Sequence, residues 1–193
     1  MQLRLRMFSR CDGSQLVEFA VALPLLVVFV VGIFDFSQAF NVKLKLSGAA
    51  REGARLAASL PTGDLTGNPL SPTGGTVDAV RNVVDAYMKA AGLNDCGLVS
   101  QSATKSAGTL LWTYTAAAGN GSGCPGALIL TVNRSFAFKE TVGTNQVDVI
   151  CTQVTISYPF MWHFNSVIQL LVPGASYAGA TQIPTDALAP NLD

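Results

Sequence analysis

Apolar positions are concentrated in one run near the amino terminus of the chain. From Leu16 to Phe34, nineteen consecutive positions hold a single ionisable residue, Glu18. At about 1.5 Å per residue, a helix over this run is about 28 Å long, close to the roughly 30 Å hydrocarbon core of a bilayer. The run predicts a membrane-spanning helix over residues 14–36. Three arginines within residues 1–13 favour a cytoplasmic amino terminus.

A secretory signal peptide is an alternative interpretation of the same run. Its cleavage site would be the small-x-small triplet that ends at Ala39, which would release a soluble binding domain starting at Phe40. The run is longer than the usual signal core of about 7–15 residues, it carries Glu18, and Asp35 lies close to the cut. A third interpretation is a general membrane-tethered envelope protein whose amino-terminal helix is left uncut.

The helical pattern continues beyond the apolar run. Residues 37–60 contain no proline and are rich in alanine, leucine, lysine and arginine, so one helix is expected from about Ser14 to Leu60, bent near Pro24. Small residues recur every four positions, among them Gly53. Such a face permits close packing, and we expect it to pack on the protein's own domain rather than on other subunits.

A second helix and a sheet are predicted in residues 61–193. After a loop of prolines and glycines, residues 76–91 show apolar positions at helical spacing, with Thr76 as N-cap. The predicted core stripe is Val77, Val80, Val83, Val84, Tyr87 and Ala91. The predicted solvent-facing ladder is Arg81, Asp85 and Lys89.

Three segments rich in β-branched and aromatic residues follow: 110–115, 127–138 and 147–160. The last two, joined by a turn within 140–146, are expected to form an antiparallel hairpin. In the last segment the expected inward positions are Asp148, Ile150, Thr152, Val154, Ile156 and Tyr158. The apolar tail from Phe160 could return to the bilayer surface, but we expect it to pack on the sheet. The fold class is therefore α+β.

Composition narrows the function classes. Only 12% of residues are charged, about half the roughly 25% typical of soluble domains, while 49% are hydrophobic and the mean hydropathy is +0.38. Disorder is excluded as the dominant state, and 12 basic against 12 acidic residues disfavour nucleic-acid binding. His163 is the only histidine and no C-x-x-C occurs. We therefore expect no enzyme, no metal site and no cofactor.

The cysteines predict one disulfide. Cys11 lies in the basic leader, whereas Cys96, Cys124 and Cys151 lie in the part expected to be exported to an oxidising compartment. Three thiols allow one bridge in three ways. We expect Cys96 to pair with Cys124, closing a glycine-rich hairpin, with metal binding as the alternative.

Gly13 lies five residues before Glu18, after a short basic leader. This arrangement resembles the class III signal of type IV pilins and pseudopilins. The resemblance implies that a prepilin peptidase cuts between Gly13 and Ser14, so that the helix survives as an anchor. It also implies that Glu18 pairs with the new α-amino group of a neighbouring subunit inside an apolar bundle.

The resemblance narrows further to the TadE family of the tight-adherence (Flp/Tad) pilus system. The residues that carry it are Glu18-Phe19, Leu23-Pro24, Gly32 to Phe36 with Asp35 as the acid, and Ala49 to Ala58. It covers about residues 10–60 and implies a pilin-like minor pilin or pseudopilin of the inner membrane. Its implied partners are the prepilin peptidase, the pilin, a sister pseudopilin and the inner-membrane platform.

The apolar pattern and the family resemblance together give the expected domain organisation. Residues 1–13 form a cytoplasmic leader, 14–36 the transmembrane helix, 37–60 its extension, and 61–193 an exported α+β domain.

Overall fold

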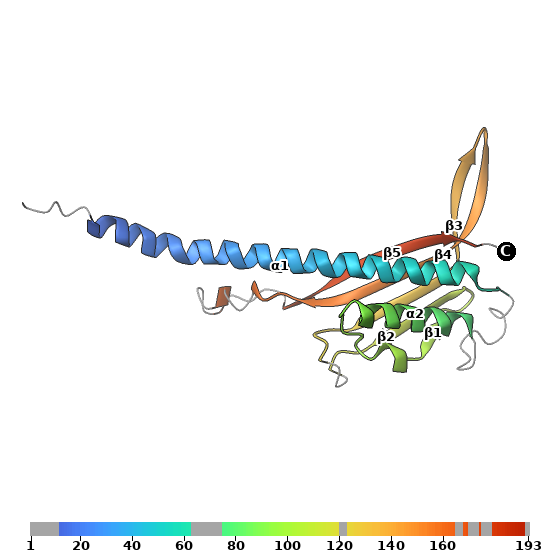
Figure 1. Cartoon of the computed structure of the whole chain (residues 1–193). Helices are drawn as coiled ribbons and strands as arrows, with labels where there is room; N and C mark the ends of the chain where they lie inside the picture. The colour runs from blue at the N-terminus through green and yellow to red at the C-terminus, as the bar shows by residue number, and fades with distance from the viewer. Residues whose placement is uncertain are drawn as a thin grey trace, which may run out of the picture. The chain divides into compact units, whose positions relative to one another are not determined.

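The computed structural model of the chain describes residues 12–62, 75–119, 123–164, 168–169, 174 and 179–191. In chain order its elements are α1 (Asp12–Ser59), α2 (Thr76–Ala90), the short 3-10 helix η1 (Leu98–Ser100), β1 (Ala103–Lys105), β2 (Leu111–Ala116), β3 (Leu128–Val142), β4 (Asn145–Met161) and β5 (Ala180–Pro190) (Figure 1). The predicted α+β class, with a long amino-terminal helix, a second helix and a small antiparallel sheet, is confirmed.

The chain divides into two compact units. The first contains residues 1–37 and 162–179, and the second contains residues 38–161 and 180–193. Helix α1 contributes its first half to one unit and its second half to the other. The connection between β4 and β5 also belongs to the first unit, although both strands belong to the second. The leader, residues 1–11, lies outside the described residues.

Helix α1 begins two residues before the predicted start and ends one residue before the predicted end. Its sequence supplies strong helix formers throughout, and Pro24 is accommodated inside it. A proline removes one backbone donor, which membrane helices tolerate better than soluble ones. The bend expected at Pro24 stays a prediction.

The second unit is built on a five-stranded antiparallel sheet in the order β1-β2-β3-β4-β5, so each strand pairs with its neighbour in sequence. The predicted hairpin is the β3–β4 pair, but its strands are longer than expected. Strand β3 ends at Val142 and β4 begins at Asn145, and these two residues pair with each other. The reason is a two-residue turn in which Gly143 takes a left-handed φ of 68°, so the ladder continues to the tip.

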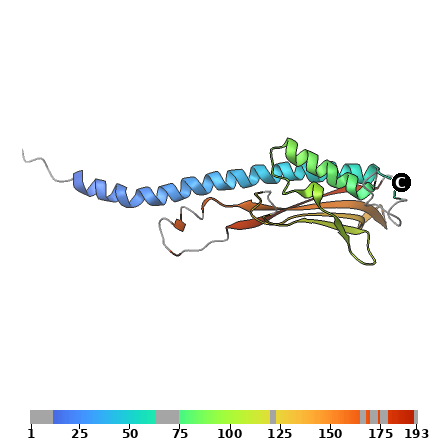
Figure 2. The ribbon, with the colours of Figure 1, turned by 90° about the horizontal axis from the view of Figure 1, so that it is seen from below.

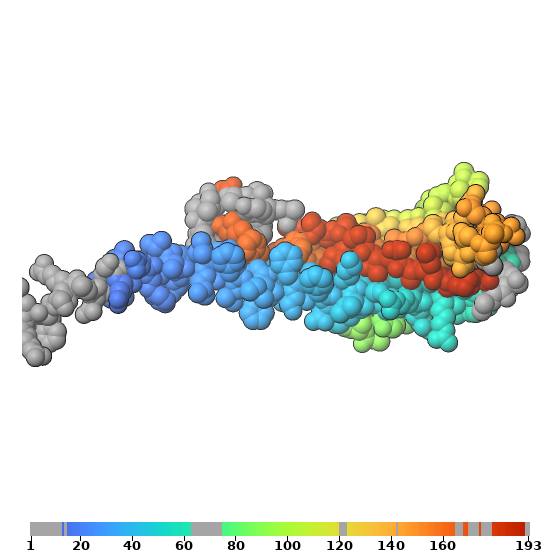
Figure 3. All heavy atoms as spheres, turned by 90° about the horizontal axis from the view of Figure 1, so that it is seen from above, coloured from blue at the N-terminus to red at the C-terminus, as the bar shows by residue number. Residues whose placement is uncertain are grey.

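Helix α2 and the second half of α1 cover one face of this sheet, and the core lies between them (Figure 2). Strand β5 runs beside the second half of α1, as the sphere view also shows (Figure 3). The fully buried side chains include Leu46, Ala49, Ala50, Val77, Val80, Val84, Met88, Trp112, Tyr114, Leu130, Val132, Val154 and Ile156. The small-residue face of α1 therefore packs on its own domain, as expected.

Gly53 shows how close this packing is. A Cβ atom added at Gly53 would lie 2.7 Å from Cγ2 of Val84, which is fully buried. Glycine lets the two helices approach to a distance that any side chain would prevent.

Three details of α2 differ from the prediction. Gly75, not Thr76, is the N-cap, and Thr76 is already helical. Tyr87, predicted to lie in the core, is 40% exposed, and the neighbouring Met88 is buried there instead. Asp85, expected in solvent, is 5% exposed. The loop after α2 folds back and brings Asp95 and Lys89 together beside it, which the helical period alone does not reveal.

The inward face of β4 is as predicted from Thr152 to Tyr158, but Asp148 and Ile150 are exposed. The cause is a one-residue bulge in β3. Asn133 pairs with Gln153, yet Phe136 pairs with Cys151, so one extra residue lies between them. Beyond this point the hairpin projects away from the helices, and neither face of it is covered by them (Figure 1).

Candidate functional site

The first half of α1 exposes apolar side chains over most of its circumference, while the half-buried residues Pro24, Val28 and Val31 recur at helical spacing on one face. Large apolar side chains along this half are strongly exposed. The exposed fraction is 70% for Leu16, 71% for Val21 and 69% for Ile33. A helix that is apolar on all sides is normally buried in protein or in lipid. Among the described residues, one helix is long and apolar enough to cross a membrane, and it is this one. It fits a membrane anchor.

The residues expected to carry processing lie at the start of this helix. Gly13 is the second residue of α1, and it is exposed with no atom within 4 Å of an added Cβ. Ser14 follows it within the helix. Glu18 is exposed one turn later and lies in the apolar stretch.

Asp35 marks the other end of the apolar stretch and is 2% exposed. The backbone N–H of Phe164 donates to its Oδ2 at 2.6 Å, and Nδ1 of His163 lies 3.3 Å from its Oδ1. Both carboxylate oxygens therefore have partners, as a buried carboxylate requires. We call Trp162–Phe164 the strap, because this described start of the β4–β5 connection contacts α1.

Aromatic side chains reinforce the strap. The rings of Trp162 and Phe36 meet edge to face with their centroids 5.3 Å apart. A Cβ added at Gly32 would lie 3.6 Å from the ring of Phe164. The backbone N–H of Trp162 donates to the carbonyl of Gly179 at 3.1 Å, which closes the connection where it leaves the sheet. In the tail that we expected to pack on the sheet, Phe160 and Met161 belong to β4, whereas Trp162–Phe164 contact α1. Most of residues 165–178 lie outside the described residues.

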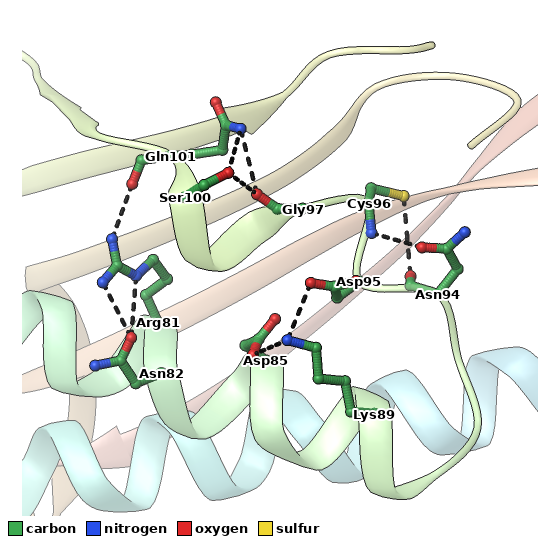
Figure 4. A network of polar contacts seen from close by, with 10 residues as sticks. All are labelled: Arg81, Asn82, Asp85, Lys89, Asn94, Asp95, Cys96, Gly97, Ser100 and Gln101. Atoms are coloured by element: carbon green, nitrogen blue, oxygen red, sulfur yellow. Dashed lines mark hydrogen bonds and ion pairs between the residues drawn. The ribbon is translucent and has the colours of Figure 1, made fainter. Parts of the chain in front are cut away.

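A second polar cluster lies in the other unit, between α2 and the loop that follows it (Figure 4). Nζ of Lys89 lies 2.8 Å from Asp85 and 3.2 Å from Asp95. Burial raises the pKa of the Asp85 carboxyl above its usual value, and the neighbouring Asp95 adds to this effect. Although partial burial acts in the opposite direction, hydrogen bonds with Asp85 and Lys89 lower the pKa of Asp95. The two carboxyls thus share the ammonium group of Lys89, and their pKa values shift in opposite directions.

The same loop carries the disulfide. Cys96 is bonded to Cys124, with 5.6 Å between their Cα atoms, and Cys151 is free and buried. This is the pair named from the sequence. Cys96 is the one non-glycine among the described residues with a positive φ, 54°. Its N–H donates to the side chain of Asn94 at 2.9 Å, which stabilises that turn. The cluster therefore fixes the disulfide loop to α2.

A third set of contacts ties α2 to the sheet. The hydroxyl of Tyr114 donates to Asp78 at 2.8 Å, and the Arg81 guanidinium lies over the Tyr114 ring, 5.4 Å from its centroid. Arg81 also donates to the carbonyl of Gln101 at 2.8 Å. Burial, together with the Asp78 carboxylate, raises the pKa of Tyr114 well above its usual range, so the phenol stays neutral. These contacts position α2 on the sheet.

No group of three or more His, Cys, Asp or Glu within the described ranges could hold a metal ion. Sequence reasoning singled out Gly13, Ser14, Glu18, Cys96 and Cys124. It did not identify the contact of Asp35 with the strap. The sequence places Asp35 at the edge of the apolar run, which predicts that its carboxylate has a hydrogen-bond partner but does not identify that partner.

Comparison with known proteins agrees with the amino-terminal features. Residues 13–55 match the family model described as TadE-like protein. No curated protein and no solved structure matches the chain. The resemblance to the TadE-like family is thus confirmed over this segment, which includes Gly13, Glu18 and Asp35. The matched segment contains the apolar stretch of α1 that fits a membrane anchor.

Proposed function

We propose that this TadE-like chain is a minor pilin or pseudopilin that assists biogenesis of a Flp/Tad type IV pilus. It is a single-pass protein of the inner membrane with a cytoplasmic leader and an exported domain. A prepilin peptidase cuts between Gly13 and Ser14, and the remaining helix serves first as anchor and then as a packing element. Its partners are the pilin, a sister pseudopilin and the inner-membrane platform, and its role is assembly rather than catalysis.

One observation carries the proposal: the largely exposed apolar stretch of α1 contains a single carboxylate near its start, Glu18. A carboxylate within a membrane costs on the order of 2.5–3.5 kcal/mol at the centre of a helix, and less near its end. After the cut, the α-amino group of Ser14 becomes a cation of opposite charge. A neighbour's amino group paired with Glu18 offsets this cost and sets the register between subunits.

The disulfide supports export of the second unit. Structural disulfides form and persist in oxidising compartments and are rare in the cytoplasm. The bond between Cys96 and Cys124 therefore suits a domain on the outer side of the inner membrane.

The first experiment determines the amino terminus of the mature protein by mass spectrometry of isolated membranes. We expect a chain that starts at Ser14. A chain that starts at Phe40 would instead identify an ordinary signal peptide cut after Ala39, with a released binding domain as the function. An intact leader would favour the membrane-tethered envelope protein.

The second experiment tests Glu18 in cells that assemble the pilus. Glu18→Ala should leave cleavage at Ser14 intact but reduce co-purification with pilus components and piliation. Glu52→Ala is the matched control, because Glu52 is an exposed acid on the same helix, outside the apolar stretch. Equal co-purification and piliation in Glu18→Ala and Glu52→Ala would remove the role assigned to Glu18.

A further inference from the structure

We infer that the strap, together with Phe36, is a second membrane contact that lies among the phospholipid headgroups and upper acyl carbons. The occupant of this surface is the bilayer that surrounds α1. The inference rests on the membrane span of the proposed function, so its test reads the span and the strap separately.

Depth along α1 gives the first argument. The apolar stretch from Leu16 to Phe34 is about 28 Å long at 1.5 Å per residue, which matches the hydrocarbon core of a bilayer. Asp35 is the next residue and therefore lies at the boundary of that core. The 2.6 Å hydrogen bond from Phe164 to Asp35 fixes the strap at the same depth.

The side chains at this depth have the chemistry of a membrane interface. Trp162 has a large apolar ring with one polar N–H, and such rings are enriched where hydrocarbon meets headgroups. Its neighbour Phe36 is 60% exposed, and the side chain of His163 is 69% exposed. An apolar surface with polar tips fits the headgroup region better than bulk water or hydrocarbon.

The exposed surface is continuous with the lipid-facing helix. Ile33, Phe34 and Phe36 are each at least 60% exposed and lead directly from the apolar stretch to the ring of Trp162. Lipid that covers the helix therefore also covers this surface. The same bilayer can therefore contact both the apolar stretch of α1 and the surface formed by Phe36 and Trp162.

Asp35 has a positioning role in this arrangement. A carboxylate beside hydrocarbon is costly unless its oxygens are hydrogen-bonded. The strap supplies a backbone N–H and an imidazole, and so shields the carboxylate while the carboxylate holds the strap at the interface. The bond to Phe164 requires an acceptor oxygen but not a charge.

Depth-dependent fluorescence quenching tests the inference on the full chain in vesicles of phosphatidylcholine and phosphatidylglycerol, at high lipid-to-protein ratio. The chain has two tryptophans, and Trp112 is fully buried in the core of the second unit. A Trp162→Phe protein therefore serves as the blank. The span is read by adding Phe29→Trp to that blank, because Phe29 is 64% exposed in the apolar stretch.

We expect the Phe29→Trp signal to be quenched most by bromines deep in the acyl chains. The Trp162 signal should be quenched about twofold more by bromines near the headgroups than by deep ones, since its ring lies at the interface. In one contrary outcome, deep bromines quench Phe29→Trp, lipid bromines do not quench Trp162, and aqueous iodide quenches Trp162 fully. That outcome would overturn the membrane contact of the strap but retain the membrane span of α1. Protection of Trp162 from both quenchers would show that protein and not lipid covers its ring, which also overturns the inference. Absence of lipid quenching at both positions would overturn the strap and the membrane anchor together.

Two variants separate positioning by Asp35 from its charge. Asp35→Ala removes the acceptor of the Phe164 N–H, so iodide quenching of Trp162 should rise and shallow lipid quenching should fall. Asp35→Asn retains an acceptor oxygen and should keep the quenching pattern of the original chain. Unchanged quenching in a folded Asp35→Ala protein would contradict the positioning role. If Asp35→Ala does not fold, the depth of Trp162 in Asp35→Asn still decides the inference.

Discussion

Arg134 of β3 caps the carboxyl end of α1, donating from Nη2 to the carbonyl of Leu60 at 3.0 Å. Its Nη1 donates to the carbonyl of Ala57. Helix α1 has no basic residue in its own last turn, so its final carbonyls obtain a cation from a strand more than seventy residues away. Arg134 is 2% exposed, and its backbone N–H is bonded to Leu110 next to the bulge of β3. This contact fixes the end of the long helix to the sheet.

Replacing Arg134 tests the cap. Arg134→Met should lower the free energy of unfolding by about 3 kcal/mol, because one buried and one partly buried carbonyl lose a charged hydrogen-bond donor. Arg134→Lys should recover only part of this, since an ammonium cannot reproduce the planar fork. Thermal and chemical unfolding of the detergent-solubilised chain measures both. Arg55→Met, at an exposed position of the same helix, is the control and should change stability little. Equal stability of the Arg134→Met and Arg55→Met proteins would contradict the cap.

Gly53 is predicted to be required by packing and not by backbone conformation. In Gly53→Ala the added methyl meets Val84, and overpacking of this kind costs about 1–3 kcal/mol. The gain in helix propensity, about 1 kcal/mol, offsets part of that cost. A net loss of stability is expected in the same unfolding assay. Gly179→Ala adds a methyl where no atom lies within 4 Å and should be tolerated. A Gly53→Ala protein as stable as the original chain would show that the two helices separate without cost.

The disulfide between Cys96 and Cys124 closes a loop with a sequence separation of 28. By loop-closure entropy, its removal should destabilise the second unit by about 3–4 kcal/mol. The double variant Cys96→Ser, Cys124→Ser measures this against Cys11→Ser, which removes a cysteine from the leader. If the double variant and the Cys11→Ser control unfolded at the same temperature, the disulfide would contribute nothing to stability.

The buried carboxyl of Asp85 predicts a pH dependence with a definite sign. Its pKa in the folded protein is raised above the ordinary 3.8, so its contribution to stability is fully present below 3.8 and is lost as the pH rises through the raised value. Relative to Asp85→Asn, the original chain should therefore become less stable as the pH increases from about 4 to 7.

Asp95 provides the matched comparison because its pKa is lowered. Its contribution to stability is present above 3.8 and is lost as the pH falls through the lowered value. Relative to Asp95→Asn, the original chain should therefore become less stable as the pH decreases below about 4. Urea unfolding at a series of pH values measures both variants. Slopes of the same sign would contradict the opposite pKa shifts of the two carboxyls.

The sequence by itself determined the elements that depend on local pattern. The apolar run and its alanine-rich extension specify α1, the valine spacing specifies most of α2, and β-branched residues specify β3 and β4. Gly13, Glu18 and Asp35 lie in a segment whose motif is readable without a structure. The choice of Cys96 and Cys124 needed only their flanking glycine-rich segment and the exclusion of the leader cysteine.

Only the tertiary structure decided which residues far apart in the chain meet. Asp85 reads as a solvent position by helical period, yet the loop carrying Asp95 covers it. The strap reaches Asp35 across 129 positions, and Arg134 reaches Leu60 across 74. Periodicity records which side of an element a residue occupies, but not which distant segment covers that side. That choice depends on how the whole chain satisfies its buried polar groups, because each buried carboxylate or carbonyl requires a donor wherever the fold can supply one.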